Sequence, residues 1–189
     1  MVEENKTTDE KADNSAPDDF AEIDKQPCPM CSKNELTLRE FSRDIPFFGK
    51  VFVFSMSCSN CGYHKSDVEP AEQRDSAKYS MDVSGEEDMN VRIVKSASAT
   101  VKIPRITTIT SGPASNGYVT NVEGLLNRVK TIIEHLRDES EDKSERKKAK
   151  NMLKKIQNVM WGRESIKITI EDPTGNSAII SEKAVKQKL

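Results

Sequence analysis

The chain has 189 residues, a formal net charge of −2 and 32 % charged residues. This length suits one domain or two small ones. No run approaches the ~18 apolar residues of a membrane span, and the beginning of the chain lacks the apolar core of a signal peptide. These features favour a cytoplasmic protein and give no reason to expect a membrane partner.

Residues 1–26 are expected to form a disordered acidic tail. Residues 1–25 hold nine carboxylates against three lysines, and their only large apolar side chains besides Met1 and Val2 are Phe20 and Ile23. Such a segment buries too little apolar surface to offset the entropy of ordering it. Without its charge of −6, the rest of the chain is about +4, which is weaker than the concentrated basic stripe of a typical nucleic-acid binder.

All four cysteines occur in two pairs of the same spacing. The pairs are separated by 26 residues and read Cys28-Pro29-Met30-Cys31 and Cys58-Ser59-Asn60-Cys61. Each Cys-x₂-Cys supplies two thiolates from one turn, and two such turns form a closed tetrahedral Zn²⁺ site. Two disulfides or a redox pair are the alternatives, but nothing else indicates an oxidising compartment, and a redox motif needs only one pair. We predict one structural zinc ion with all four cysteines as ligands.

Residues 27–68 are predicted to form a zinc ribbon. Alternation from Leu36 and the β-branched and aromatic run 51–56 indicate two strands, joined by a turn at 45–49 that contains Pro46. Phe47 and Phe48 are adjacent in this turn, so both cannot easily point into one small hairpin. The sequence leaves open whether they are core or an exposed patch for a partner or for the next domain.

Residues 69–182 are predicted to form a β-rich domain with an inserted helical hairpin. Short alternating runs near 89–94, 99–103 and 106–110, and again after residue 165, favour a sandwich or jelly-roll sheet. Apolar residues at helical spacing predict two helices within about 121–160, the first with a capping box from Thr120 to Glu123.

The expected fold class is therefore α+β, mainly β. A cationic run at 146–155 is interpreted as a solvated helix face, with an anionic partner surface as the alternative. Residues 183–189 are expected to fray.

The sequence resembles the Zpr-type zinc-finger family from Cys28 to about Ser181, with its motifs in the family's order. These motifs are Cys28–Cys31, Ile45–Phe48, Ser57–Tyr63, Arg92–Thr100, Ile103-Pro104, Val122–Leu126 and Glu171–Ser177. The resemblance implies a four-cysteine finger and a double-stranded β-helix domain that carries the helical hairpin. Eukaryotic members typically hold this unit twice, so one copy implies a compact, archaeal-like form. The implied role is to bind the translational GTPase elongation factor one-alpha and to help it fold.

The main hypothesis is a zinc-dependent interaction protein, a chaperone or adaptor for that GTPase. The finger would present Phe47 and Phe48, and two turn-rich loops would complete the surface. Plain turn chemistry also explains these loops. Their candidate residues are Gly112, Gly117, Asp172, Gly175 and Asn176.

The alternative hypothesis is a nucleic-acid-binding zinc ribbon, in which aromatic rings stack on bases. The basic residues that would serve it are Lys33, Arg39, Arg43, Lys50 and Lys65. An enzyme is not expected, because His64 and His135 are the only histidines and no catalytic constellation or phosphate-binding motif occurs.

Overall fold

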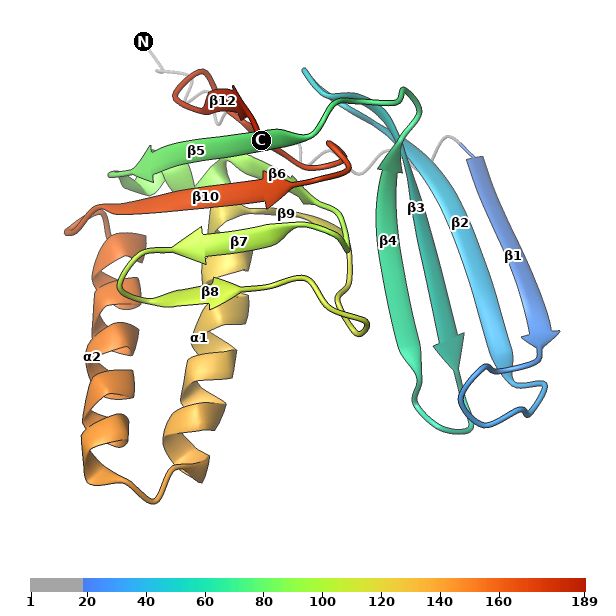
Figure 1. Ribbon diagram of the computed structural model, residues 1–189, viewed down its shortest axis with the longest axis horizontal. Coiled ribbons are helices and arrows are strands. Elements are labelled where there is room, and N and C mark those ends of the chain that lie inside the picture. The colour runs from blue at the N-terminus through green and yellow to red at the C-terminus, as the bar shows by residue number, and fades with distance from the viewer. Residues whose placement is uncertain (1–18) are drawn as a thin grey trace, which may run out of the picture.

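The computed structural model of the protein describes residues 19–189. It contains a four-stranded sheet beside a second β unit, and two long helices extend from the second unit (Figure 1). The first 18 residues of the expected acidic tail lie outside the described range.

The four-stranded sheet, called the finger sheet below, is antiparallel with the order β1-β2-β3-β4. Leu36 pairs with Cys58 at one end of the β2–β3 hairpin, and Ile45 pairs with Gly49 at the other. The hairpin was predicted, and the structure adds a strand on each side of it. The strands are β1 (Asp19–Gln26), β2 (Leu36–Ile45), β3 (Gly49–Cys58) and β4 (His64–Pro70).

Strand β1 corrects the predicted end of the disordered tail, because residues 19–26 are paired with β2. The ordering comes from backbone pairing and cross-strand charge pairs rather than from apolar burial. Glu22 lies 2.5 Å from Arg39, and Asp19 lies 3.1 Å from Lys50. Phe20 stays exposed, so the apolar pattern gave no signal for this strand.

The second unit is a jelly roll of two sheets, as predicted. One sheet has the order β12-β5-β10-β7-β8 and the other has the order β11-β6-β9. In Figure 1, β6 and β9 lie behind β10 and β7, and buried side chains of both sheets form one apolar core. The elements are β5 (Ala77–Val83), a 3₁₀ helix (Glu86–Asn90), β6 (Arg92–Lys95), β7 (Thr100–Ile103), β8 (Thr107–Ile109), β9 (Tyr118–Asn121), β10 (Ile166–Asp172), β11 (Ala178–Ile180) and β12 (Val185–Lys188).

The end of the chain also differs from the prediction. Residues 183–189 were expected to fray, but β12 pairs with β5 along four residues. Its side chains are exposed, so this strand too is held by backbone hydrogen bonds.

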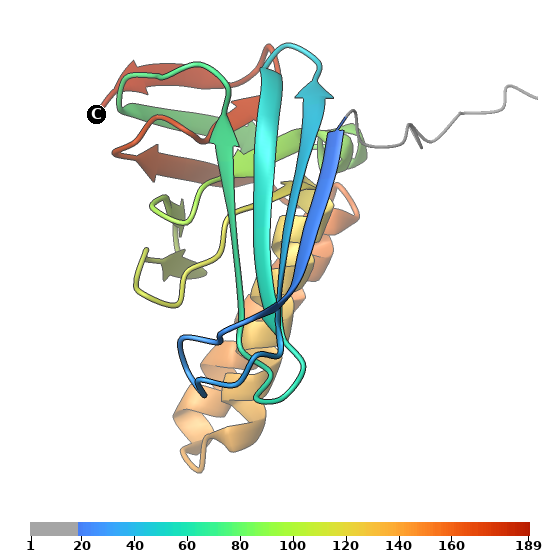
Figure 2. The same cartoon turned by 90° about the vertical axis from the view of Figure 1, so that its right-hand side faces the viewer.

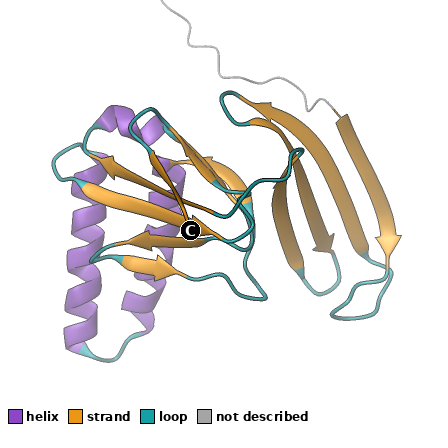
Figure 3. Cartoon of the chain, turned by 45° about the horizontal axis from the view of Figure 1, so that its top comes forward, coloured by secondary structure: helices purple, strands orange, loops and turns teal. Residues whose placement is uncertain are grey.

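The helical hairpin lies where the sequence placed it, as α1 (Val122–Glu139) and α2 (Lys143–Met160), and covers one side of the jelly roll (Figure 3). Its start differs by one residue, because Asn121 and not Thr120 is the N-cap and accepts a hydrogen bond from the Gly124 N–H at 2.8 Å. Asn is a stronger cap than Thr. No helix within residues 19–189 is long and apolar enough to cross a membrane.

The finger sheet contacts the jelly roll at one end. Apolar side chains from both units form a single cluster there, and its buried members are Ile45, Phe48, Val51, Val68, Val94 and Ala178. Polar contacts continue the interface along β4. Gly117 donates its N–H to the Ser66 carbonyl at 2.8 Å, and Ala97 donates its N–H to the Asp67 carboxylate at 2.7 Å. Figure 2 shows the finger sheet standing in front of the jelly roll.

Candidate metal centre

The two cysteine pairs lie in turns with the same backbone hydrogen bonds. In the first turn, Cys28 donates its N–H to the Lys33 carbonyl (2.9 Å) and accepts from the Ser32 N–H (2.8 Å). The second turn repeats both bonds, with Cys58 in place of Cys28 and Gly62 in place of Ser32. Ser32 (φ 58°) and Gly62 (φ 72°) are both left-handed. Glycine commonly adopts this conformation, which accounts for Gly62, but the sequence gave no sign that Ser32 adopts it as well.

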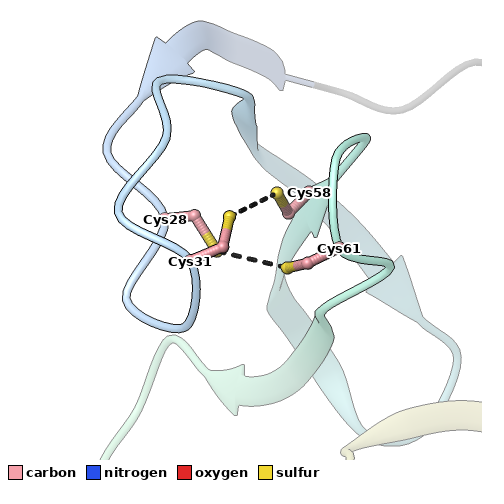
Figure 4. A group of neighbouring side chains, drawn as sticks. All are labelled: Cys28, Cys31, Cys58 and Cys61. Carbon is pink, nitrogen blue, oxygen red and sulfur yellow. Dashed lines mark hydrogen bonds between the residues drawn. The ribbon is translucent and has the colours of Figure 1, made fainter.

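The four sulfur atoms converge on one point (Figure 4). They all lie within 4.8 Å of one another, and two of the distances, Cys28 to Cys61 and Cys31 to Cys58, are 3.7 Å. A tetrahedron with metal–sulfur bonds of about 2.3 Å has edges of about 3.8 Å. All four cysteines are free thiols, whereas a disulfide would need sulfurs about 2 Å apart. The arrangement is positioned to bind a metal ion.

The electrostatics of the cluster also favour a cation. The pKa of Cys31 is lowered to about 7, chiefly by the backbone N–H of Lys33. The backbone N–H of Tyr63 acts in the same direction on Cys61, but burial and the three neighbouring sulfurs outweigh it and raise the pKa of Cys61 to about 12. Four thiolates this close repel one another. A bound cation removes that repulsion and lets all four ionise.

Little else holds this end of the finger sheet together. Leu36 is the only buried side chain beside the cysteines in the local cluster, within the described residues. A side-chain hydrogen bond of 2.9 Å joins Lys33 to Asn60 across the two turns. His64 is not part of the cluster, because its Nδ1 shares a hydrogen bond with the Ser57 hydroxyl at 3.0 Å. The metal is therefore expected to supply most of the cohesion at this end.

The two phenylalanines predicted to bind a partner have different environments. Phe47 is 100 % exposed, at the end of the sheet opposite to the cysteines. Phe48 is 6 % exposed and belongs to the cluster between the two units. The Arg74 guanidinium lies 3.9 Å from the centroid of the Phe48 ring. The expectation that both rings face a partner is therefore wrong for Phe48, because the jelly roll covers it.

The structure also separates the predicted loop residues by environment. Gly112 is open, with no atom within 4 Å of an added Cβ. Gly117 is buried against β4, where a Cβ would lie 2.4 Å from the Asp67 carboxylate. Gly175 (φ 74°) is buried against the Asp75 carbonyl, and Asn176 is half-buried. Close packing between segments, rather than access for a partner, explains the two buried glycines.

Asp172 is 0 % exposed and organises a network that the sequence did not reveal. Its carboxylate accepts hydrogen bonds from the hydroxyls of Ser177 (2.5 Å), Thr174 (2.7 Å) and Ser96 (2.8 Å). Burial alone would raise the pKa of Asp172, but these hydrogen bonds outweigh it and lower the pKa. The Asp-Pro-Thr-Gly motif predicted a turn, whereas the bond to Ser96 depends on tertiary contact. Asp172 is thus a structural anchor rather than part of an accessible surface.

The basic residues named for nucleic acid are mostly engaged within the finger. Arg39 pairs with Glu22, Lys50 with Asp19, and Lys33 bonds Asn60. These contacts leave less unpaired positive charge on the finger than the sequence suggested, which weakens that alternative.

The fold and the four-cysteine cluster define a class, a metal-binding finger joined to a jelly-roll domain. Family models match both parts, a ZPR1 zinc-finger domain over residues 22–75 and a ZPR1 jelly-roll domain over residues 87–188. The chain belongs to the ZPR1 family, and the resemblance seen in its motifs is confirmed.

Several relatives are similar over most of this chain. A ZPR1-like protein of Methanocaldococcus jannaschii is 38 % identical over 162 residues, which is 85 % of this chain and 82 % of the relative. A ZPR1-like protein of Pyrococcus horikoshii is 36 % identical over 178 residues, 92 % of this chain and 80 % of the relative. The zinc finger chaperone zpr1 of Schizosaccharomyces pombe is 32 % identical over 159 residues, which is 80 % of this chain but 33 % of that protein.

Proposed function

We propose that this protein is a chaperone or adaptor that contains one structural zinc ion and binds the translational GTPase elongation factor one-alpha. Family membership and the Schizosaccharomyces pombe relative, which is named a chaperone, support the general role. The observation that carries the proposal is the fully exposed ring of Phe47. This role requires no reaction, and we propose that the protein is not an enzyme.

Phenylalanine at position 47 destabilises the turn in which it lies. Pro46 precedes it, and the Phe48 N–H bonds the Ile45 carbonyl at 2.9 Å, which closes the turn. Phe47 has φ 65°, as the third residue of a type II turn does, and glycine is the usual residue there. A side chain with a Cβ costs roughly 1–2 kcal/mol in this conformation. Local stability therefore does not explain Phe47, whereas a partner that buries the ring does.

A groove beside Phe47 would extend such a surface. It has a volume of about 570 Å³ and runs between the β2–β3 turn and the jelly roll. Tyr79 and Ile180 contribute apolar walls, and Lys186 and Glu182 lie at its polar edge. An apolar segment of a partner could bind between the apolar walls of this groove, since protein interfaces typically have aromatic anchors surrounded by a polar rim.

The test is Phe47→Gly in the full chain. Because glycine relieves the turn, the variant should bind zinc normally and unfold in urea with a free energy about 1 kcal/mol higher than wild type. Binding to purified elongation factor one-alpha, measured by interferometry, should fall at least tenfold. A gain in stability with a loss of binding is a combination that mere unfolding cannot produce.

The matched control is Phe20→Gly, which removes another exposed phenylalanine of the finger sheet. It should leave binding within twofold of wild type. Unchanged binding in Phe47→Gly would contradict the proposed surface. The nucleic-acid hypothesis would replace the proposed function if two results are found together. These are that the charge reversals Lys33→Glu and Lys50→Glu abolish binding of nucleic acid, and that Phe47→Gly leaves binding of the GTPase unchanged.

A further inference from the structure

Helix α2 holds a concentration of positive charge that the rest of the chain does not share. Its residues, Lys143–Met160, include seven basic side chains and one carboxylate, Glu145, which gives the helix a net charge of +6. The whole chain has a net charge of −2, so its other residues together are −8. The neighbouring helix α1 differs, because its four carboxylates outnumber its three basic side chains.

Four of these lysines form a row along one exposed face of α2. Lys143, Lys147, Lys150 and Lys154 recur every three or four residues, a spacing that places them on the same side of a helix. All four are exposed, and among residues 19–189 none of them forms an ion pair. Like charges at this spacing destabilise a helix, so helix stability does not explain the lysine row.

An exposed aromatic ring ends the lysine row. Trp161 follows Lys154 by seven residues, about two turns of helix, and is the C-cap of α2. It is the only tryptophan of the chain, and it is 51 % exposed. The Arg163 guanidinium lies 4.7 Å from the centroid of its ring. From Lys143 to Trp161 this face is about 27 Å long, at 1.5 Å per residue.

Three carboxylates lie near the two ends of this face. Glu145 accepts a hydrogen bond from the Ser140 hydroxyl at 2.9 Å, and Glu164 accepts one from the Asn158 side chain at 2.8 Å. The Glu86 side chain lies beside Gly162. Within the described part of the chain, none of the three forms an ion pair with the lysine row or with Arg163. The positive charge of the row is therefore available to an anionic ligand.

The combination of lysines and an exposed indole favours one class of anionic ligand, single-stranded nucleic acid. Lysines contact phosphates, and the indole stacks on a base that is not paired. A membrane surface fits less well, because a helix that binds there inserts its own apolar side. In α2 that side is packed into the core of the jelly roll, and the helix lies at the edge of the molecule with α1 beside it (Figure 1).

We propose that the lysine row and Trp161 form a binding site for single-stranded nucleic acid. The lysines contact the phosphates, and the indole stacks on one base, beside which Arg163 adds a further positive charge. None of these residues lines the groove beside Phe47. The inference therefore goes beyond the proposed function and does not depend on it. It also differs from the finger hypothesis, whose basic residues lie in the other unit of the protein.

The experiment titrates the full chain with an oligouridylate and with an oligothymidylate, each about 12 nucleotides long. Because Trp161 is the only tryptophan, its fluorescence reports stacking directly and should fall as the site fills. The dissociation constant in dilute NaCl should be about 10 μM. A duplex of the same length should not change the fluorescence. Binding of either single strand supports the proposal, and the tighter one identifies RNA or DNA as the preferred ligand.

The double variant Lys147→Gln with Lys150→Gln tests the lysine row. Glutamine is a good helix former, and less repulsion within the row should leave stability in urea unchanged or higher. The dissociation constant should rise at least tenfold. The slope of its logarithm against the logarithm of the NaCl concentration should fall by about 1.4, because each phosphate contact to a single strand contributes about 0.7. The matched control, Lys186→Gln with Lys188→Gln on the exposed strand β12, should bind within twofold of wild type.

Trp161→Leu tests the stacking contact separately from the charges. Binding should weaken at least fivefold, which is within the range for the loss of one stacked base. The salt dependence should stay as in wild type, because no phosphate contact is removed. An equal loss of affinity with a reduced salt slope would show that the indole only positions the lysines, and the stacking part of the proposal would be wrong.

The proposal is wrong if neither oligonucleotide binds below about 0.1 mM, or if both bind without changing the fluorescence of Trp161. It is also wrong if Lys33→Glu with Lys50→Glu abolishes binding and the variants of the lysine row do not, because the ligand then lies on the finger. Vesicles that contain phosphatidylserine test the membrane alternative, and polyglutamate tests an acidic protein. If either one changes the fluorescence of Trp161 and the oligonucleotides do not, the site belongs to that ligand instead.

Discussion

The two ends of the finger sheet are stabilised in different ways. At the metal end, four cysteines surround one point and Leu36 is the main buried side chain beside them. At the packed end, Ile45, Val51 and Val68 are completely buried against the jelly roll. The ten-residue strands β2 and β3 connect these ends, about 30 Å apart at 3.4 Å per residue.

This difference shows how a single-layer sheet without a core of its own can be ordered along its whole length. A metal ion bound by the four cysteines would substitute for the missing interior at one end, and the neighbouring domain provides that interior at the other. We therefore expect the two ends to respond separately to mutation. The predictions below test that separation, from the largest expected effect to the smallest.

The largest effect is expected from Cys58→Ser. A structural zinc site contributes on the order of 10 kcal/mol to the folding of a small finger, so zinc content should fall from one equivalent to near zero. Amide hydrogen exchange should become fast around Leu36 and remain slow at Val51 and Val68, because the jelly roll still covers those residues. The control is His64→Ala, which should keep a full equivalent of zinc. Loss of protection along the whole sheet would show that the two ends are coupled.

Phe48→Ala should have the opposite pattern to Cys58→Ser, with a loss of stability at the packed end and an unchanged zinc content. Removing a buried ring costs about 3 kcal/mol, and the Arg74 guanidinium would lose its aromatic contact. Urea unfolding should show this loss, while elemental analysis still finds one zinc per chain. A variant that lost zinc in parallel with stability would contradict the separation.

Asp172→Asn tests the side of the jelly roll next to the packed end. The amide cannot accept all the hydroxyl donors, and we expect a loss of about 2 kcal/mol at pH 7. The folded-state pKa of Asp172 lies below the ordinary value of 3.8. Its ionised form therefore stabilises the protein above about pH 4, and this contribution disappears as the pH falls through the folded-state pKa.

The difference between Asp172→Asn and wild type should accordingly shrink between pH 5 and pH 2, as measured by urea unfolding at each pH. A difference that stays constant over this range would mean that the charge of Asp172 does not contribute. Glu72→Gln, on an exposed side chain, is the control for general effects of charge.

The smallest effect is expected from Ser32→Gly at the metal end. Ser32 has φ 58°, and glycine adopts this conformation without the Cβ penalty. We expect a gain of up to about 1 kcal/mol, seen as tighter zinc retention in a chelator competition. Ser59→Gly, in the second cysteine turn, should bring no gain. Weaker zinc retention in Ser32→Gly would mean that the serine side chain stabilises the turn in some other way.

The features that the sequence determined are those whose causes are local. The spacing of Cys28, Cys31, Cys58 and Cys61 predicted a common metal site, because each pair acts within a single turn. The helical hairpin followed from apolar periodicity. The turn at residues 45–49 followed from Pro46 and Gly49, whose backbone constraints act at the residue itself.

Other features had no local signal. Strand β12 and the tail residues 19–26 are edge strands, held by backbone pairing that a polar sequence can also supply. The strand Ala77–Val83 had no predicted counterpart, although it lies inside the five-stranded sheet, between β12 and β10. It pairs with β10, and the paired residues are more than 80 positions apart in the sequence. A pattern read over a few consecutive residues cannot reveal such long-range pairing.

Phe47 and Phe48, two adjacent residues, also show which features the local sequence determines and which depend on tertiary contacts. The sequence established that Phe47 and Phe48 share a tight turn and cannot both point into the hairpin. Only the tertiary structure decided which one is buried, because the residues that cover Phe48 include Val94 and Ala178 of the jelly roll. Burial depends on what approaches from elsewhere in the chain, whereas a turn or a pair of metal ligands depends on neighbours in the sequence.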